Sequence, residues 1–142
     1  MQKLKKYRIR TVGCFIIYKN KFLILHRKPE KSQGGKWGLP AGKVNKRESD
    51  KKAILREIRE ETGYKAKPKE LEFLLERLWE FKDKIVEFPT YRLRLNKKIK
   101  VKHNPDEHQG YKWVTPKQCY KMKNLIHGFH DLLRILKWNL IK

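Results

Sequence analysis

The sequence is poor in acidic residues and in cysteine, and it lacks any long hydrophobic run. It has 15 Asp and Glu against 37 Lys and Arg in 142 residues, which gives a formal net charge of +22. No apolar stretch approaches the roughly 20 residues that a membrane-spanning helix needs, and no apolar segment typical of a secretion signal follows the first charged residues. Cys14 and Cys119 match no metal-binding or disulfide-rich pattern. We therefore expect a cytoplasmic protein with reduced cysteines and no membrane partner.

The composition is that of a folded domain with a basic surface. Apolar residues make up 39% of the chain and aromatic residues 11%, which is enough to bury a core in a chain of this length. There is no internal repeat and no Gly/Ser/Pro-rich linker, so we predict a single domain over residues 1–142, with residues 1–8 as a loose basic arm. The excess of positive charge indicates polyanionic partners.

Local patterns predict strands that alternate with helices. Residues 9–18 and 22–27 are rich in β-branched and aromatic residues and predict a hairpin. Ser49 is a good N-cap and Gly63 suits a left-handed C-terminal cap, so a helix is predicted between them. Further predictions are strands at 36–39, 71–81, 85–95 and 111–114, a short helix from Pro116 and a last helix near 125–140. This order predicts an α/β domain with a mixed sheet.

Three glutamates lie close together on the predicted helix. Glu57, Glu60 and Glu61 are spaced i, i+3 and i+4, and at about 100° per residue they fall within an arc of roughly 100°. Like charges this close repel one another unless lysines or a metal ion lie among them. Carboxylates without nearby His or Cys favour a hard cation such as Mg²⁺ or Mn²⁺. An isolated cluster of this kind is more often an ordinary charged helix face, so the surrounding residues decide the interpretation.

These surroundings resemble the signature of the Nudix hydrolases, which runs here from Gly42 to Tyr64. The residues that carry the resemblance are Gly42, Glu48, Arg56, Glu57, Glu60, Glu61 and Gly63. Tyr64 is the one departure, because an aliphatic residue is usual there. The segment 37–42 is similar to the family's approach to this signature, and the resemblance extends over residues 9–138. It implies an α/β/α sandwich with a mixed sheet between helices, and hydrolysis of the P–O–P bridge of a nucleoside diphosphate linked to a further group.

The resemblance also implies a metal site and a catalytic base. Glu57, Glu60 and Glu61 would bind Mg²⁺, or Mn²⁺, with the carbonyl of Ala41 as a further ligand. The base that activates water differs among Nudix enzymes. Glu57 is the favoured candidate here, and Glu107, which precedes the late strand, stays open as a base or metal ligand.

Other residues of the signature would position these groups. Arg56 beside Glu57 is interpreted as an ion pair that holds the carboxylate in one geometry. Glu48 would brace the loop ahead of the helix through backbone hydrogen bonds. Gly42 and Gly63 are interpreted as backbone devices, whatever the function.

Candidates for substrate binding are basic and aromatic. Arg27, at the end of the second strand, and Lys43, next to Gly42, are candidates for phosphate contact. Tyr91 is the first aromatic candidate for stacking on a base. The other aromatic candidates are Trp37, Trp79 and Phe88.

Three functions remain open at the level of sequence. The leading one is hydrolysis of a nucleoside triphosphate or a dinucleoside polyphosphate, since residues 106–114 are similar to a segment of diadenosine tetraphosphate hydrolases. The second is removal of pyrophosphate from the 5′ end of RNA, for which a basic surface would track the backbone. The third is a catalytically silent domain that binds nucleotide or RNA, against which the complete set of carboxylates argues. The oligomeric state is left open.

Overall fold

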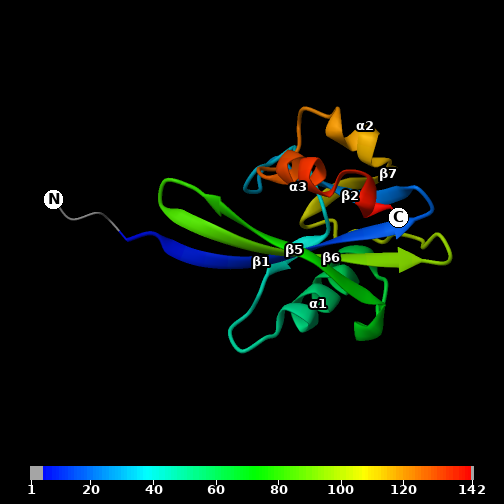
Figure 1. Ribbon diagram of the computed structural model, residues 1–142, viewed down its shortest axis with the longest axis horizontal. Helices are drawn as coiled ribbons and strands as arrows, with labels where there is room; N and C mark the ends of the chain where they lie inside the picture. The colour runs from blue at the N-terminus through cyan, green and yellow to red at the C-terminus, as the bar shows by residue number, and fades with distance from the viewer. Residues whose placement is uncertain (1–4, 142) are drawn as a thin grey trace.

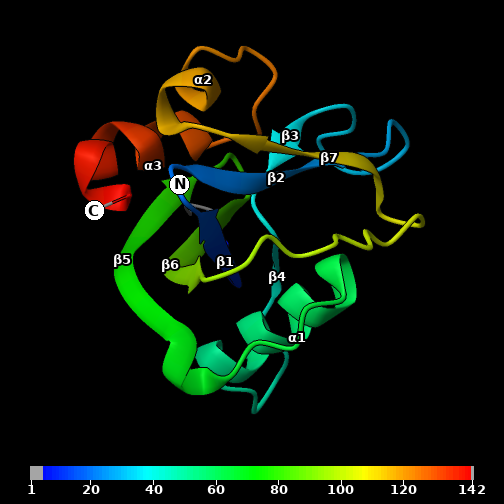
Figure 2. The same ribbon diagram turned by 90° about the vertical axis from the view of Figure 1, so that its right-hand side faces the viewer.

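A mixed β-sheet forms the centre of the fold in the computed structural model, which describes residues 5–141 (Figures 1 and 2). The strands are β1 (Tyr7–Tyr18), β2 (Lys21–Arg27), β3 (Trp37–Gly38), β4 (Ala41–Lys43), β5 (Leu71–Glu80), β6 (Lys84–Leu95) and β7 (His108–Val114). The helices are α1 (Asp50–Thr62), α2 (Pro116–Tyr120) and α3 (Phe129–Leu136), with 3₁₀ turns at Pro68–Glu70 and Lys137–Leu140. Helix α1 covers one face of the sheet, and α2 and α3 cover the other (Figure 1). This is the predicted α/β/α sandwich.

Strand β1 is the middle strand of the sheet, whose main order is β3-β2-β1-β6-β5. It pairs in parallel with β6, from Tyr7 opposite Lys84 to Tyr18 opposite Leu95. The β1–β2, β2–β7 and β5–β6 pairs are antiparallel, so the sheet is mixed as predicted. The short strand β4 pairs with the middle of β1 and leads the chain toward α1 (Figure 2).

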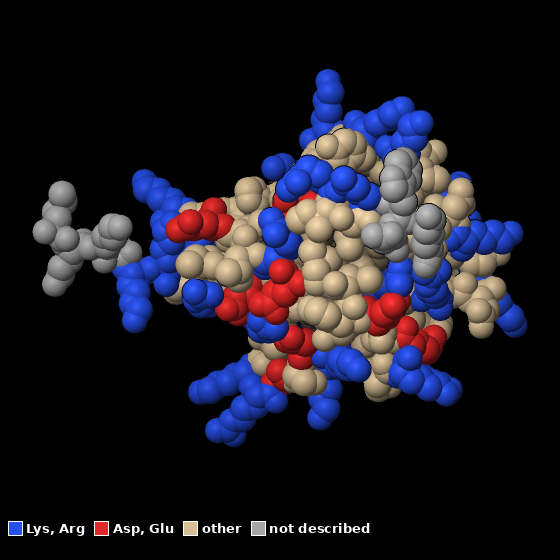
Figure 3. Space-filling model, in the orientation of Figure 1, with Lys and Arg blue, Asp and Glu red and all other residues tan. Residues whose placement is uncertain are grey.

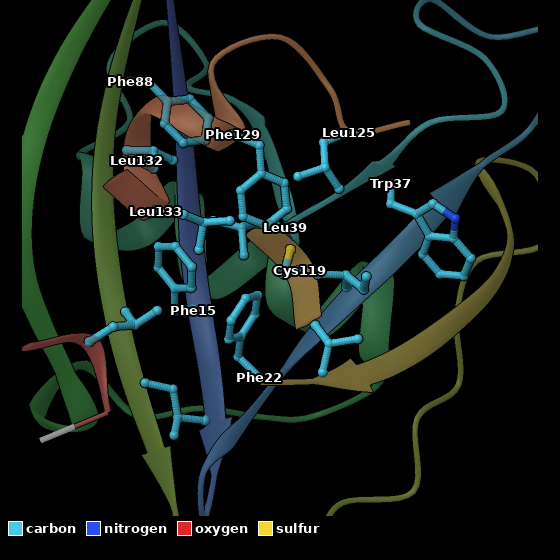
Figure 4. Close-up of a cluster of buried hydrophobic side chains, with 14 residues drawn as sticks. Phe15, Phe22, Trp37, Leu39, Phe88, Cys119, Leu125, Phe129, Leu132 and Leu133 are labelled. Atoms are coloured by element: carbon cyan, nitrogen blue, oxygen red, sulfur yellow. The ribbon is translucent and has the colours of Figure 1, made fainter. Parts of the chain in front are cut away.

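Side chains of β1 alternate between two hydrophobic cores because successive residues of a strand point to opposite faces. Phe15 and Ile17 pack in the core that α3 completes with Phe129 (Figure 4). Cys14 and Ile16 pack in the second core, which α1 completes. Each fully buried large apolar side chain stabilises the fold by about 2 kcal/mol, so both helix layers are held to the sheet through β1.

The structure confirms the predicted ends of the acidic helix. The Ser49 side chain accepts a hydrogen bond from the backbone N–H of Lys52 at 3.2 Å. Gly63 has a φ of 81°, and its N–H donates to the carbonyl of Arg59 at 2.9 Å. The hairpin of β1 and β2, the short strand β3 and the long strands β5 and β6 also form where the patterns predict them.

Two predictions, one for each end of the chain, are wrong in part. Helix α3 begins at Phe129 and not near Leu125, because Leu125 forms a bridge with Trp37 and Gly128 adopts a φ of 90°, which interrupts any earlier helix. Residues 7 and 8 of the expected loose arm belong to β1 and pair with β6. Residues 1–4 of that arm lie outside the described residues.

The structure also bears on the two cysteines and on the lengths of the helices. Cys14 and Cys119 are free and buried, and burial raises the pKa of the Cys119 thiol to about 12. Across residues 5–141, every helix falls short of the length and apolarity that crossing a membrane requires.

Candidate active site

A cleft of about 890 Å³ opens between the acidic side of α1, strand β4, the end of β2 and the β5–β6 hairpin. Its lining includes the carboxylates Glu57, Glu60, Glu61 and Glu107 and the basic side chains Arg27 and Lys43. The cleft therefore joins the predicted metal-binding residues to the predicted phosphate contacts in one place. Tyr91 is absent from its lining among the described residues.

Helix α1 packs one side against the sheet and carries the carboxylates of the cleft on the adjoining side. Ile54 and Ile58 are fully buried against the sheet, and Glu57 and Glu61 lie one turn apart at the edge of this buried stripe. Both glutamates are themselves buried, whereas the side chain of Glu60 is 52% exposed. The three glutamates therefore lie on one side of α1, as predicted, and two of them, Glu57 and Glu61, are buried.

Glu57 is fixed by Arg56 on one side and by Gly42 on the other. Arg56 Nη1 donates to Glu57 Oε1 at 2.7 Å. A Cβ atom built on Gly42 would lie 2.5 Å from Glu57 Oε2 and closer still to the rest of the carboxyl group, so this close approach requires glycine. Burial raises the pKa of Glu57, and the neighbouring Arg56 opposes that rise.

Glu61 is the most deeply buried carboxyl group of the cleft. The backbone N–H of Ala41 donates to Glu61 Oε2 at 3.1 Å. Burial raises the pKa of Glu61 well above its usual value, and the charge of Glu57 raises it further. Since two buried carboxyl groups this close resist ionising together, they share a proton or neutralise a cation.

The donor chemistry of this pair fits a hard divalent cation. Glu57 and Glu61 supply carboxylate oxygens next to Gly42 and Ala41, and hard divalent cations prefer oxygen ligands. Glu60 contacts Arg56 instead, at 3.5 Å. Between residues 5 and 141, no three His, Cys, Asp or Glu side chains already converge into a metal site. Glu60 therefore has to turn from Arg56 toward the pair in order to act as a third ligand.

Arg56 connects the helix to the loop that precedes it. Its guanidinium donates to both oxygens of Glu48, each at 2.9 Å, and to the carbonyl of Lys43 at 3.0 Å. Arg56 lowers the pKa of Glu48 to about 2, and the backbone N–H of Asn45, which donates to Glu48 at 3.0 Å, contributes. The backbone contact of Glu48 was predicted, but its two-point pairing with Arg56 was not, because the sequence spacing of eight residues gives no reason for it.

Arg27, the last residue of β2, and Glu107, in the loop before β7, also line the cleft. Glu107 pairs with Lys31 at 3.6 Å, and its side chain is 42% exposed. Arg27 Nε donates to the carbonyl of Ser32 at 2.7 Å, which ties the end of β2 to the following loop. The positive charge of Arg27 lowers the pKa of Glu61 against the effect of burial, and both groups line the cleft.

Tyr91 does not lie where base stacking would need it. It is 6% exposed and packs in the core under α1, edge to face with Phe73 at a ring distance of 5.6 Å. The reason is strand register, since Tyr91 stands opposite Cys14 on the α1 face of the sheet. Aromatic lining of the cleft comes instead from Trp79, Phe81 and Phe88.

His108, which directly follows Glu107 in the sequence, also lines the cleft. It is 4% exposed, and its Nδ1 is a buried side-chain atom with no hydrogen-bond partner among the described residues. Burial lowers its pKa to about 4, and the charge of Arg27 contributes, so the ring is neutral near pH 7.

Comparisons with known proteins point in one direction. A model of the NUDIX domain matches residues 7–134. CTP pyrophosphohydrolase from Escherichia coli (strain K12) is 28% identical over 119 residues, which cover 78% of each protein. A Caenorhabditis elegans protein that carries the nudix hydrolase name is 38% identical over 60 residues, or 39% of this chain, but the chain spans only 16% of that protein.

A solved structure gives the same result for the fold. The crystal structure of the MutT protein from Methanosarcina mazei Go1 superposes with a TM-score of 0.83 and is 29% identical, covering 99% of this chain and 100% of that chain. The likeness therefore extends over nearly the whole chain and supports the same fold.

Proposed function

This chain belongs to the Nudix hydrolase family, and we propose that it is a Mg²⁺-dependent pyrophosphohydrolase that cleaves a phosphoanhydride bond of a nucleoside triphosphate or dinucleoside polyphosphate. The observation that carries the proposal is the buried pair of Glu57 and Glu61 in the wall of a cleft that Arg27 and Lys43 also line. A buried pair of carboxylates is unfavourable in a purely structural role, and it suits a site that receives a cation together with phosphate.

The metal would be held by Glu57, Glu60 and Glu61, with the carbonyl of Ala41 as a further ligand. When bound there, a divalent cation supplies positive charge to phosphate oxygens and lowers the pKa of water. Mg²⁺ is the first choice because the ligands are all oxygens, and Mn²⁺ is the natural substitute.

The chain's own residues would divide the remaining work. Arg56 holds the Glu57 carboxylate through the 2.7 Å hydrogen bond, so that its orientation is set before substrate arrives. Glu57 accepts the proton of the attacking water, and Glu107, across the cleft, is the alternative base. Arg27 and Lys43 bind the phosphates and stabilise their negative charge.

Aromatic side chains support a nucleotide as the substrate. Trp79 and Phe81 line the cleft, and the buried ring of Phe88 supports Trp79 at a ring distance of 4.8 Å. Trp79 Nε1 also donates to Asp131 at 3.3 Å, which fixes the indole ring. A fixed aromatic surface within the cleft suits stacking on a base. The likeness to CTP pyrophosphohydrolase favours nucleoside triphosphates among the two substrate classes.

Removal of pyrophosphate from the 5′ end of RNA is the second candidate. The observation that favours it is the distribution of charge, with Lys and Arg around most of the edge of the visible face and Asp and Glu gathered in a few groups (Figure 3). Such a surface attracts a polyanion that continues beyond the reacting phosphates.

A panel of substrates tests these functions. The purified protein is incubated with Mg²⁺ and nucleoside triphosphates, dinucleoside polyphosphates, nucleotide sugars, ADP-ribose or 5′-triphosphorylated RNA, and the products are separated by chromatography. Glu60→Gln and Glu61→Gln are assayed in parallel, and Glu80→Gln, an exposed carboxylate paired with Lys6 outside the cleft lining, is the matched control.

We expect turnover of a triphosphate or dinucleoside polyphosphate by the wild type and by the control, and its loss in both cleft variants. Faster turnover of RNA, with a preference that weakens steeply in salt, would favour the second candidate. Activity that survives both substitutions would contradict the metal assignment. If the wild type hydrolyses no member of the panel, the result would favour a catalytically silent domain that binds nucleotide or RNA.

A further inference from the structure

A row of lysines lies beside the aromatic residues of β7, outside the cleft. The segment that connects β6 to β7 crosses the face shown in Figure 2, between β7 above and α1 below. We call Lys98, Lys100 and Lys102 of this segment, together with Tyr111 and Trp113 of β7, the β7 strip. The strip begins next to the cleft, since β7 starts at His108, which lines it.

The lysines of the strip point to solvent because the residues between them are anchored in the core. Ile99 and Val101 pack in the core under α1, whereas Lys98, Lys100 and Lys102 are exposed. In an extended segment, alternate residues share a side and are spaced by about 6.6 Å. The strip therefore presents three ammonium groups in a row.

The aromatic residues of the strip share one face of β7. Tyr111 and Trp113 are two positions apart, and Tyr111 is 42% exposed. Lys98 Nζ lies 5.9 Å from the centre of the Trp113 ring, and the His103 ring lies 6.1 Å from that of Tyr111. A cation therefore lies over one ring of the strip, and an imidazole ring lies beside the other.

A second hollow, of about 270 Å³, lies at the far end of the strip from the cleft. It is lined by Tyr18, Lys19, Asn20, Lys21, Lys98 and Trp113. From His108 at the cleft to Trp113 at this hollow, β7 advances by about 16 Å. Basic and aromatic side chains therefore continue without a break over the length of several nucleotides.

The charge of the strip is not neutralised by the protein. Lysines that form ion pairs within residues 5–141 are Lys6, Lys28 and Lys31, and each of them lies elsewhere. None of the three strip lysines has an Asp or Glu partner in that part of the chain. An unneutralised row of cations favours a partner that carries regularly spaced negative charge.

We propose that the β7 strip binds single-stranded nucleic acid. The lysines contact successive phosphates, while Tyr111 and Trp113 stack on bases, a combination that is typical of single-strand binding without sequence preference. Tyr111 is exposed and Trp113, which packs on the core with one side, lines the second hollow, so unstacked bases reach these rings more easily than paired bases do. This binding goes beyond the proposed hydrolysis because it needs neither metal nor a 5′ phosphate.

Fluorescence anisotropy tests the proposal. The probe is a labelled oligouridylate of about 12 nucleotides with a 5′ hydroxyl, titrated with the full chain at several salt concentrations. A triple variant with Lys98→Gln, Lys100→Gln and Lys102→Gln is compared with the matched control Lys117→Gln, Lys121→Gln and Lys123→Gln on and beside α2. Both triple variants lower the net charge from +22 to +19, so they differ only in location.

We expect the strip variant to bind at least tenfold more weakly and the slope of log K against log salt to fall in magnitude by about 2, as three lost phosphate contacts predict. The control keeps most of the affinity. Equal losses in both triple variants, or equal affinity for a duplex of the same length, would overturn the proposal.

The aromatic part of the strip has its own test. Tyr111→Leu keeps an apolar side chain on an exposed position but removes the ring, so we expect roughly tenfold weaker binding, while Tyr111→Phe keeps wild-type affinity. Glu61→Gln leaves binding unchanged, which separates this proposal from the proposed hydrolysis. Wild-type binding by Tyr111→Leu would contradict the stacking role.

Discussion

Replacing Gly42 by alanine tests whether the position of the Glu57 carboxylate controls catalysis. The new Cβ atom would lie 2.5 Å from Glu57 Oε2, whereas ordinary contact begins at 3.4 Å. The carboxyl group therefore has to move by about 1 Å or leave Arg56. A misplacement of about 1 Å in a catalytic group lowers the rate by roughly 100-fold, and overpacking of this kind destabilises a fold by about 1–3 kcal/mol.

The assay measures kcat with the triphosphate that the wild type hydrolyses fastest, together with the free energy of unfolding by urea. Gly110→Ala is the matched control, because a Cβ atom built there meets nothing within 4 Å. We expect Gly42→Ala to lose about 100-fold in kcat, with a smaller change in stability, and the control to retain wild-type values.

A double variant separates displacement from simple destabilisation. Glu57→Asp shortens the side chain by one methylene, which gives the Cβ atom of Gly42→Ala room. The double variant should regain stability but not activity, because the shortened carboxylate no longer reaches its working position. Wild-type kcat in Gly42→Ala alone would refute the reasoning, since it would mean that the carboxylate position has no effect on the reaction.

Four further outcomes follow from the same contacts. Mg²⁺ at about 100 times its dissociation constant should stabilise the wild type by about 2.7 kcal/mol in thermal unfolding and leave Glu61→Gln unshifted. Arg56→Lys should lower kcat by about 10- to 100-fold, because lysine lacks the fork that holds Glu48 and Glu57 together. The folded-state pKa of Glu48 is depressed to about 2, so its stabilising effect is present above its ordinary pKa and is lost as pH falls toward 2; urea unfolding across that range should show a weaker acid sensitivity in Glu48→Gln. Leu132→Ala should cost about 2–5 kcal/mol in the same measurement, because this side chain is buried in the core under α3.

The acidic helix was accessible from sequence because its ends and its acidic side depend on short-range chemistry, whereas the function class followed from the resemblance to the Nudix signature. The cap residues Ser49 and Gly63 act on their own neighbours in the chain, and both ends of α1 form as predicted. The common side of Glu57, Glu60 and Glu61 follows from helix geometry alone. Local rules of this kind hold wherever the helix packs.

Predictions failed where the answer depended on partners distant in sequence. Tyr91 is buried because its strand register turns it toward α1, and the last helix begins late because Leu125 bridges Trp37. The pairing of Arg56 with Glu48 and the burial of His108 likewise arise from the folding of loops onto the helix and sheet. These contacts join residues far apart in the sequence, so local patterns do not specify them.

The sequence by itself determined that this chain carries a carboxylate-bearing helix on a basic α/β domain, because caps, spacing and composition act locally, and its resemblance to the Nudix signature implied the function class. Only the tertiary structure decided which carboxylates leave water. Glu61 is buried by the approach of β4 and accepts a hydrogen bond from the backbone N–H of Ala41, whereas Glu60, one residue earlier, stays exposed. The tertiary structure also decided where the positive charges lie, since Arg27 lines the cleft, whereas Lys98, Lys100 and Lys102 are exposed in a row beside β7. Burial and long-range charge are properties of the assembled fold, so they change the chemistry of residues whose identity the sequence had already given.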